Sequence, residues 1–418
     1  MQATTYDRYV MPDLNKATQG RGGRFDPMVF SVALEGYGNF RVKIALSLIS
    51  CKKLVLKRIR HKSDSPGVDD AEVCLLKLAD KISNGTVIKI NDTGTVVSVS
   101  PGTLIGGSFS FECFNSRGIG YYLEFLLMVA PFCKTPIEAT LVGVSNAPHD
   151  PSVDMIAQTW LPIYRISVGL SAGASTKIDV RKRGIYPGGG GEVLFSSRPC
   201  SGVVPIDKID FGKVYRVRGI AWSCRVSSSY GQSLVSGAKS VLNQFLSDVY
   251  FTIDHRKGQY AGKSPGFGLT LWAERKDGGV YSAEAMSEPE GSDNVLMDAE
   301  TMGKLAANRL LDQIYRGGFI DSGTQSLAFV LMACESGRNA SRLAVGNLSE
   351  YSVCTLRLIQ KFLGVTFNFQ YRSQDNPIKL SKENMEDNEN ETDIDSYPKM
   401  LIATCFGAGV QNINKSIR

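Results

Sequence analysis

The sequence predicts an α/β protein in which a large domain of repeated modules carries a smaller inserted α/β domain. Three observations lead to this prediction: the length, an internal repeat, and a central segment with its own order of strands and helices. The chain has 418 residues, more than one hydrophobic core usually serves, so two domains are expected. A hydrophobic content of 43% and a charged content of 21% are typical of folded proteins.

The repeat begins with two glycine pairs at equivalent places. Gly36-x-Gly38 precedes Cys51-Lys52, and Gly118-x-Gly120 precedes Cys133-Lys134, with the same offset of 82 residues for the glycines and the cysteine. An apolar helical run lies between the markers, and a β-branched stretch follows each cysteine. Chance in a glycine-rich chain is the alternative explanation. The pattern favours packed α/β modules that share a fold, and residues 325–345 and 351–369 repeat its helix–strand part.

The central segment predicts the inserted domain at residues 212–297. Residues 214–225 read as a strand and residues 229–248 as an amphipathic helix, followed by three more strands up to residue 286. We expect residues 298–315 to form a helix that returns the chain to the large domain, which would then comprise residues 27–211 and 298–418. Two further segments are predicted to be flexible: a polar extension at residues 1–26, and an acidic loop at residues 381–396, which has too few apolar residues to offset its ordering entropy.

A basic, glycine-rich stretch stands out near the middle of the chain. Arg181-Lys182-Arg183 is followed, after Tyr186-Pro187, by four consecutive glycines at residues 188–191. Glycine accepts positive φ angles and allows another backbone or a ligand to approach closely. A flexible turn is one interpretation. Because strand-like sequences flank the run on both sides, a tight crossing beside a sheet is the interpretation we favour.

Composition narrows the class of function. The net charge is +6 and the isoelectric point is near 8.7, which is compatible with RNA binding without proving it. The nine cysteines contain no C-x-x-C pair and only three histidines are present, so we expect free thiols and no metal site. We expect no membrane association, because the longest strongly apolar run, residues 125–132, is too short to cross a bilayer.

Several separated motifs resemble those of the RNA 3'-terminal phosphate cyclase family. Residues 183–191 resemble the family signature R-G-x-Y-P-x-G-G-G, and the fourth glycine before Glu-Val resembles the cyclase-like branch of eukaryotic ribosome assembly. Further motifs follow in family order, at residues 41–47, 59–67, 101–107 and 218–219. The resemblance runs from about residue 30 to the C-terminus. It implies a large domain of βαβαββ modules with a smaller α/β insert.

Function depends on where this chain departs from the family pattern. The family's H-L-A-D-Q motif supplies a histidine nucleophile that accepts AMP from ATP; with Gln325 aligned to the motif, its place holds Asp321. The second arginine of the family's I-R-x-x-R motif falls on Ser63, and Glu35 is not securely in register with the family's acidic residue. We therefore expect a diverged site at Glu35, Ser63, Asp321 and Gln325, no catalytic residue, and no cofactor.

The basic residues that this chain shares with the family pattern are of the kind that bind phosphates. The candidate anion or RNA-binding residues are basic side chains of the first module and of the stretch before the glycines: Arg41, Lys43, Arg58, Arg60, Lys62, Arg181, Lys182 and Arg183. A solvated basic face is the alternative explanation for any one of them.

The resemblance implies a non-catalytic factor of the small-subunit processome in the nucleolus. Its partners would be a large nucleolar GTPase, the box C/D small nucleolar RNP and pre-rRNA, and its role would be pre-rRNA processing toward the small-subunit rRNA. A pre-rRNA endonuclease that uses the diverged cleft is the main alternative, and cyclase activity with a relocated nucleophile is a weaker one.

Overall fold

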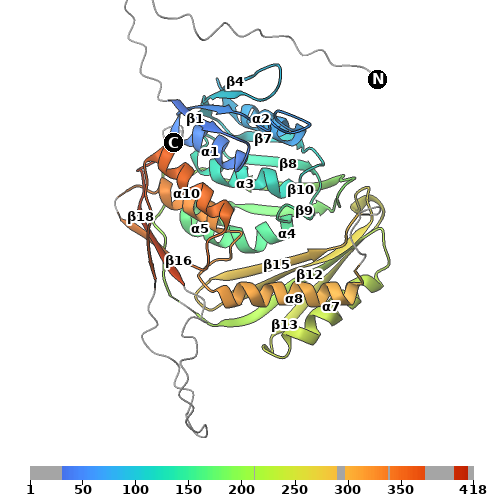
Figure 1. Ribbon diagram of the computed structural model, residues 1–418. Coiled ribbons are helices and arrows are strands. Elements are labelled where there is room, and N and C mark those ends of the chain that lie inside the picture. The colour runs from blue at the N-terminus through green and yellow to red at the C-terminus, as the bar shows by residue number, and fades with distance from the viewer. Residues whose placement is uncertain (1–30, 211, 290–296, 338, 372–399, 413–418) are drawn as a thin grey trace, which may run out of the picture.

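Helices and strands alternate through the described part of the chain, which confirms the predicted α/β class (Figure 1). The computed structural model describes residues 31–210, 212–289, 297–337, 339–371 and 400–412. The predictions for residues 1–26 and 381–396 lie outside the described residues. Within these limits, no helix has both the length and the apolar character needed to cross a membrane.

The first module is a four-stranded sheet with two helices. Its sheet order is β1-β2-β5-β4, with β1 parallel to β2 and the other pairs antiparallel. Helix α2 begins with a capping box, in which the side chains of Asp69 and Glu72 each accept a hydrogen bond from the other residue's backbone N–H. The elements are β1 (Ser31–Glu35), α1 (Phe40–Ser50), β2 (Lys53–Lys57), α2 (Asp70–Lys81), β4 (Val87–Ile90) and β5 (Val97–Ser100), and a small sheet pairs β3 (Ser83–Asn84) with β6 (Thr103–Leu104).

Two more modules repeat this topology, with sheet orders β7-β8-β10-β9 and β11-β16-β18-β17. Gly36 and Gly118 lie just before the first helix of their modules, so the 82-residue offset marks a structural repeat. The second module consists of β7 (Gly107–Glu112), α3 (Ile119–Val129), β8 (Ile137–Gly143), α4 (Val153–Met155), the π-helical turn Ile156–Trp160, α5 (Leu161–Val168), α6 (Leu170–Ser175), β9 (Lys177–Lys182) and β10 (Gly191–Ser197). The third consists of β11 (Asp207–Lys208), α9 (Gln325–Cys334), β16 (Ala340–Val345), α10 (Glu350–Leu363), β17 (Asn368–Tyr371) and β18 (Leu401–Phe406).

The first helices of the modules form the centre of the large domain. Every residue of α3 and α9 is buried, and α3 contacts both α1 and α9. Their sequences are apolar nearly all round, which is the pattern of a helix enclosed on every side. One hydrophobic cluster runs through all three modules, so the modules share a single core.

The glycine run crosses from β9 to β10, which confirms the tight crossing beside a sheet. A Cβ atom on Gly184 would lie 2.3 Å from the backbone nitrogen of Gly191, and one on Gly189 would lie 2.4 Å from Oδ1 of Asn115. Gly189 also has a φ of +61°. Larger residues would force these segments apart.

The inserted unit interrupts the third module between β11 and α9. Its sheet has the order β13-β12-β14-β15. The elements are β12 (Val214–Cys224), α7 (Ser229–Leu242), β13 (Val249–Arg256), the 3₁₀ turn Gly258–Tyr260, β14 (Gly266–Arg275), β15 (Val280–Met286) and α8 (Ala299–Arg316).

Helix α8 differs from the prediction that residues 298–315 return the chain to the large domain. It lies beside α7 on the inserted sheet (Figure 1), and its apolar side chains belong to the inserted unit's own hydrophobic cluster. The contact is close: a Cβ atom on Gly237 of α7 would lie 2.0 Å from the carbonyl oxygen of Glu300. By packing, the inserted unit therefore extends to the end of α8.

Candidate functional site

Asp321 lies just before α9 and is only 2% exposed. Its Oδ1 accepts hydrogen bonds from the backbone N–H (2.9 Å) and hydroxyl (2.7 Å) of Thr324. Its Oδ2 accepts from the backbone N–H of Ser282 at 3.0 Å and from the Ser282 hydroxyl. Burial raises the pKa of the Asp321 carboxyl. Both oxygens are thus occupied in fixing the start of α9 to strand β15.

Gln325 is also buried and engaged with backbone. Its Nε2 donates to the carbonyl oxygen of Asn347 (3.1 Å), and its Oε1 accepts from the N–H of Ser349 (3.3 Å). Because Ser349 caps α10, Gln325 ties the beginnings of α9 and α10 together. The structure gives it an architectural role.

The two cations on α1 are turned inward. Arg41 forms an ion pair with Glu124 at 2.8 Å, approaches Asp150 at 3.4 Å and donates to the Tyr351 hydroxyl at 3.2 Å. Lys43 is 5% exposed, and its Nζ donates to the carbonyl oxygen of Gly36 at 2.9 Å. Burial lowers the pKa of Lys43 to about 8. Arg41 thus joins the three modules, and neither residue faces solvent.

The cations that follow β2 are held by local carboxylates. Arg60 forms two hydrogen bonds with Glu72, of 2.7 and 2.8 Å, and one with Asp69 at 3.1 Å. Arg58 lies 3.3 Å from Glu35 in an exposed ion pair. Lys62 and Ser63 are exposed in the same loop. The cations of the first module therefore do not converge on one anion site.

The basic stretch before the glycines divides into two environments. Arg183 is 1% exposed, and its guanidinium donates to Asp154 (2.5 Å), Asp254 (2.8 Å) and Asn146 (2.9 Å). Arg181 is exposed and 3.9 Å from Glu192, while Lys182 is half-buried. Arg183 consequently holds the second module against the inserted unit, and its buried guanidinium is not exposed to an RNA ligand, contrary to the prediction.

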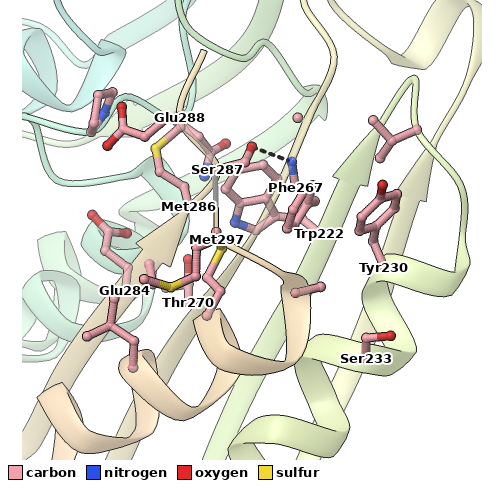
Figure 2. A pocket seen from close by; sticks show the side chains of 18 of the residues that line it. Trp222, Tyr230, Ser233, Phe267, Thr270, Glu284, Met286, Ser287, Glu288 and Met297 are labelled. Carbon is pink, nitrogen blue, oxygen red and sulfur yellow. Dashed lines mark hydrogen bonds between the residues drawn. The ribbon is translucent and has the colours of Figure 1, made fainter. Parts of the chain in front are cut away.

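A cleft of about 1310 Å³ lies between the loop after β8 and the inserted unit (Figure 2). Among the described residues that line it, the charged groups are mainly acidic: Glu284, Glu288, Asp298 and Glu300, with Arg309 as the one cation. Apolar and aromatic side chains, among them Phe267, Tyr230, Met286 and Met297, cover much of the remainder. Such a lining repels phosphate groups.

Glu284 is the titratable group inside this cleft. Its Oε1 accepts from the backbone N–H of Ser152 at 3.1 Å, and burial raises its pKa to about 7. Three buried polar atoms of the lining have no hydrogen-bond partner within the described structure: Nδ2 of Asn146, Nε1 of Trp222 and Oγ1 of Thr270. The described residues contain no cluster of His, Cys, Asp or Glu arranged to hold a metal ion.

Comparison with known proteins decides the family. The model of the RNA 3'-terminal phosphate cyclase family matches residues 32–369. The chain belongs to the RNA 3'-terminal phosphate cyclase family. It is 39% identical to the human RNA 3'-terminal phosphate cyclase-like protein over 93% of this chain and 98% of that protein. It is 33% identical to the rRNA processing protein rcl1 of Schizosaccharomyces pombe, over 90% of this chain and 95% of that protein.

Within this cyclase family member, sequence reasoning missed the cleft residues. Glu284, Trp222 and Thr270 lie on three different strands of the insert, and no motif links them along the chain. The sequence does show one local charge pattern in the inserted unit. Residues 255–273 contain Arg256, Lys257 and Lys263 and no acidic residue.

Proposed function

We propose that this protein is a non-catalytic factor in pre-rRNA processing, acting in the small-subunit processome toward the small-subunit rRNA. The observation that carries the non-catalytic part is the state of Asp321, whose two oxygens already accept four hydrogen bonds where the family pattern places the nucleophile. The role in rRNA processing is supported by similarity to the rRNA processing protein of fission yeast. In this proposal the protein works in the nucleolus with a large nucleolar GTPase and the box C/D small nucleolar RNP.

The ion pairs of two arginines in family motifs and the charge of the cleft lining support the same conclusion. Transfer of AMP from ATP requires cations that neutralise the developing charge on the phosphates. Arg41 and Arg60 are engaged by Glu124 and Glu72, and the cleft lining is acidic. A protein that contributes its surfaces to an assembly requires none of this chemistry.

A pre-rRNA endonuclease is the second candidate, and Glu284 is the observation that favours it. A carboxyl with a pKa of about 7 suits general acid–base catalysis near neutral pH. The same cleft, however, offers one arginine against four carboxylates to an RNA phosphate. We therefore rank the endonuclease below the non-catalytic factor.

Replacement of Glu284 by glutamine separates the two candidates. The substitution keeps the shape and the bond to Ser152 but removes the titratable proton. In cells that depend on the variant, a non-catalytic factor gives normal pre-rRNA cleavage at normal protein abundance, with the GTPase still co-purifying. Lost cleavage with abundance and GTPase binding intact would favour the endonuclease. Incubation with labelled ATP tests cyclase chemistry, and a covalent AMP adduct would contradict the proposal.

A further inference from the structure

Three acid-free stretches of the chain meet where the second module contacts the inserted unit. Residues 180–191, 225–247 and 255–273 contain no Asp or Glu. They are far apart in sequence, but the end of β9 and the loops beside β12 and β14 come together on the right-hand side of Figure 1. Positive charge is concentrated there without carboxylates interspersed along the chain.

Backbone hydrogen bonds fix these loops together. The N–H of Gly262 donates to the carbonyl oxygen of Arg183 at 2.6 Å, and the N–H of Lys263 donates to that of Gly189 at 2.9 Å. Nε of Arg225 donates to the carbonyl oxygen of Gly262 at 2.5 Å. The two backbone bonds therefore build the arrangement into the fold, and the Arg225 side chain adds a third connection.

Six cations lie in these loops and at the adjoining ends of β9 and β13, and we call them the basic loop cluster: Arg181, Lys182, Arg225, Arg256, Lys257 and Lys263. Arg256 is paired with Asp254 at 2.5 Å, and Arg181 is 3.9 Å from Glu192. Within the described part of the chain, the structure gives no ion pair to the three lysines of the cluster. Their charges are available to an anionic ligand.

We propose that the basic loop cluster binds the sugar–phosphate backbone of single-stranded RNA. The choice of RNA as the anion rests on the proposed role in pre-rRNA processing. Unpaired lysines neutralise phosphates. Tyr260, in the middle of the third loop, is 54% exposed and offers a ring on which a base can stack.

The charge of the acidic cleft argues against the cleft as the RNA-binding site. Its carboxylates, among them Glu288 and Glu300, disfavour phosphates. The cleft and the basic loop cluster thus lie on different parts of the same junction and carry opposite charge. RNA contacts therefore belong to the loops, where two of the candidates taken from the sequence, Arg181 and Lys182, lie, and not to the cleft.

Binding of a labelled oligouridylate to the full chain, measured by fluorescence anisotropy over a range of salt concentrations, tests the proposal. The triple variant Lys182→Ala, Lys257→Ala and Lys263→Ala should bind on the order of tenfold to a hundredfold more weakly, and the slope of log affinity against log salt should fall by about 2, since each single-strand phosphate contact contributes about 0.7. Tyr260→Ala should weaken binding on the order of tenfold.

The matched control removes the same charge elsewhere. Lys89, Lys276 and Lys361 are exposed on β4, on the β14–β15 turn and on α10, and their triple alanine variant should bind like the unmodified chain. Equal weakening by both triple variants, an unchanged salt slope, or stronger competition by polyglutamate than by oligouridylate would overturn the proposal. These outcomes leave the processing role itself intact, because that role is judged by pre-rRNA cleavage in cells.

Discussion

Arg183 and Asp254 form a buried ion pair, with 2.8 Å between Nη2 and Oδ2, across the junction of the second module and the inserted unit. Asp154, on α4 of the second module, forms a second ion pair with Arg183. Arg183→Ala leaves the buried carboxylate of Asp154 without its cation, while Asp254 keeps its ion pair with Arg256; an unpaired buried charge typically costs about 3–5 kcal/mol. We expect a loss of that size in the free energy of unfolding, measured by chemical denaturation.

Arg181 provides the control for Arg183, because it lies two residues away and is exposed. Arg181→Ala should change the free energy of unfolding by no more than about 0.5 kcal/mol, as is usual for surface substitutions. Similar losses for both variants would contradict the distinct roles that the structure gives them.

Asp321 should behave as a structural residue. Asp321→Ala leaves the N–H groups of Thr324 and Ser282 unsatisfied, and we expect a cost of about 1–3 kcal/mol, the range for orphaning buried hydrogen-bonding groups. Thermal unfolding measures the effect. Ser282→Ala removes only the hydroxyl bond and should cost less. A stable Asp321→Ala protein that fails in pre-rRNA processing would instead point to a direct role of this carboxylate.

Glu284 should make stability depend on pH. Its folded pKa of about 7 exceeds the ordinary glutamate value of 4.5, so the folded state holds the proton more tightly, and stability falls as pH rises between these values. Relative to Glu284→Gln, the unmodified protein should lose about 1–3 kcal/mol between pH 5 and pH 8, taking about 1.4 kcal/mol per pKa unit. Denaturant unfolding of both proteins over this range measures the difference, and parallel curves would be the contrary result.

The close approach of α7 and α8 gives a test of the inserted unit's packing. Gly237→Ala would place a methyl group against the carbonyl oxygen of Glu300, and overpacking of this kind typically costs about 1–3 kcal/mol. Ser236→Ala, one residue earlier on the exposed side of α7, should be nearly neutral. Thermal unfolding of the two variants compares them, and equal melting temperatures would show that the helices separate at little cost.

Local patterns in the sequence were sufficient to predict the repeated modules. The glycines before α1 and α3 and the apolar helices behind them are features of consecutive residues, and the repeated sheet order confirms the inference drawn from them. The sequence assigned helix α8 to the large domain, but it packs on the inserted unit. An amphipathic pattern shows which face of a helix is apolar, but not which surface that face packs against.

The candidate site was harder to predict because the partners of a cation are tertiary. Arg183 and Arg181 have the same side chain, yet Asp154 and Asp254, which bury Arg183, lie 29 and 71 residues away along the chain. Arg41 likewise meets Glu124 only through helix packing. Charge in a sequence identifies residues that can bind an anion, whereas the fold decides which of them are already neutralised.

Strand β18 lies between β16 and β17 in the third sheet, although it is the last strand of the described chain. Beyond it, Nδ2 of Asn412 donates to carbonyl oxygens of Pro131, Cys133 and Cys200 in the large domain. During synthesis, the first two modules can acquire their strands as they emerge, but the third sheet stays open until β18 has been made. A premature stop after residue 371 would therefore remove the middle of a sheet, and the shortened product should be a substrate for quality control.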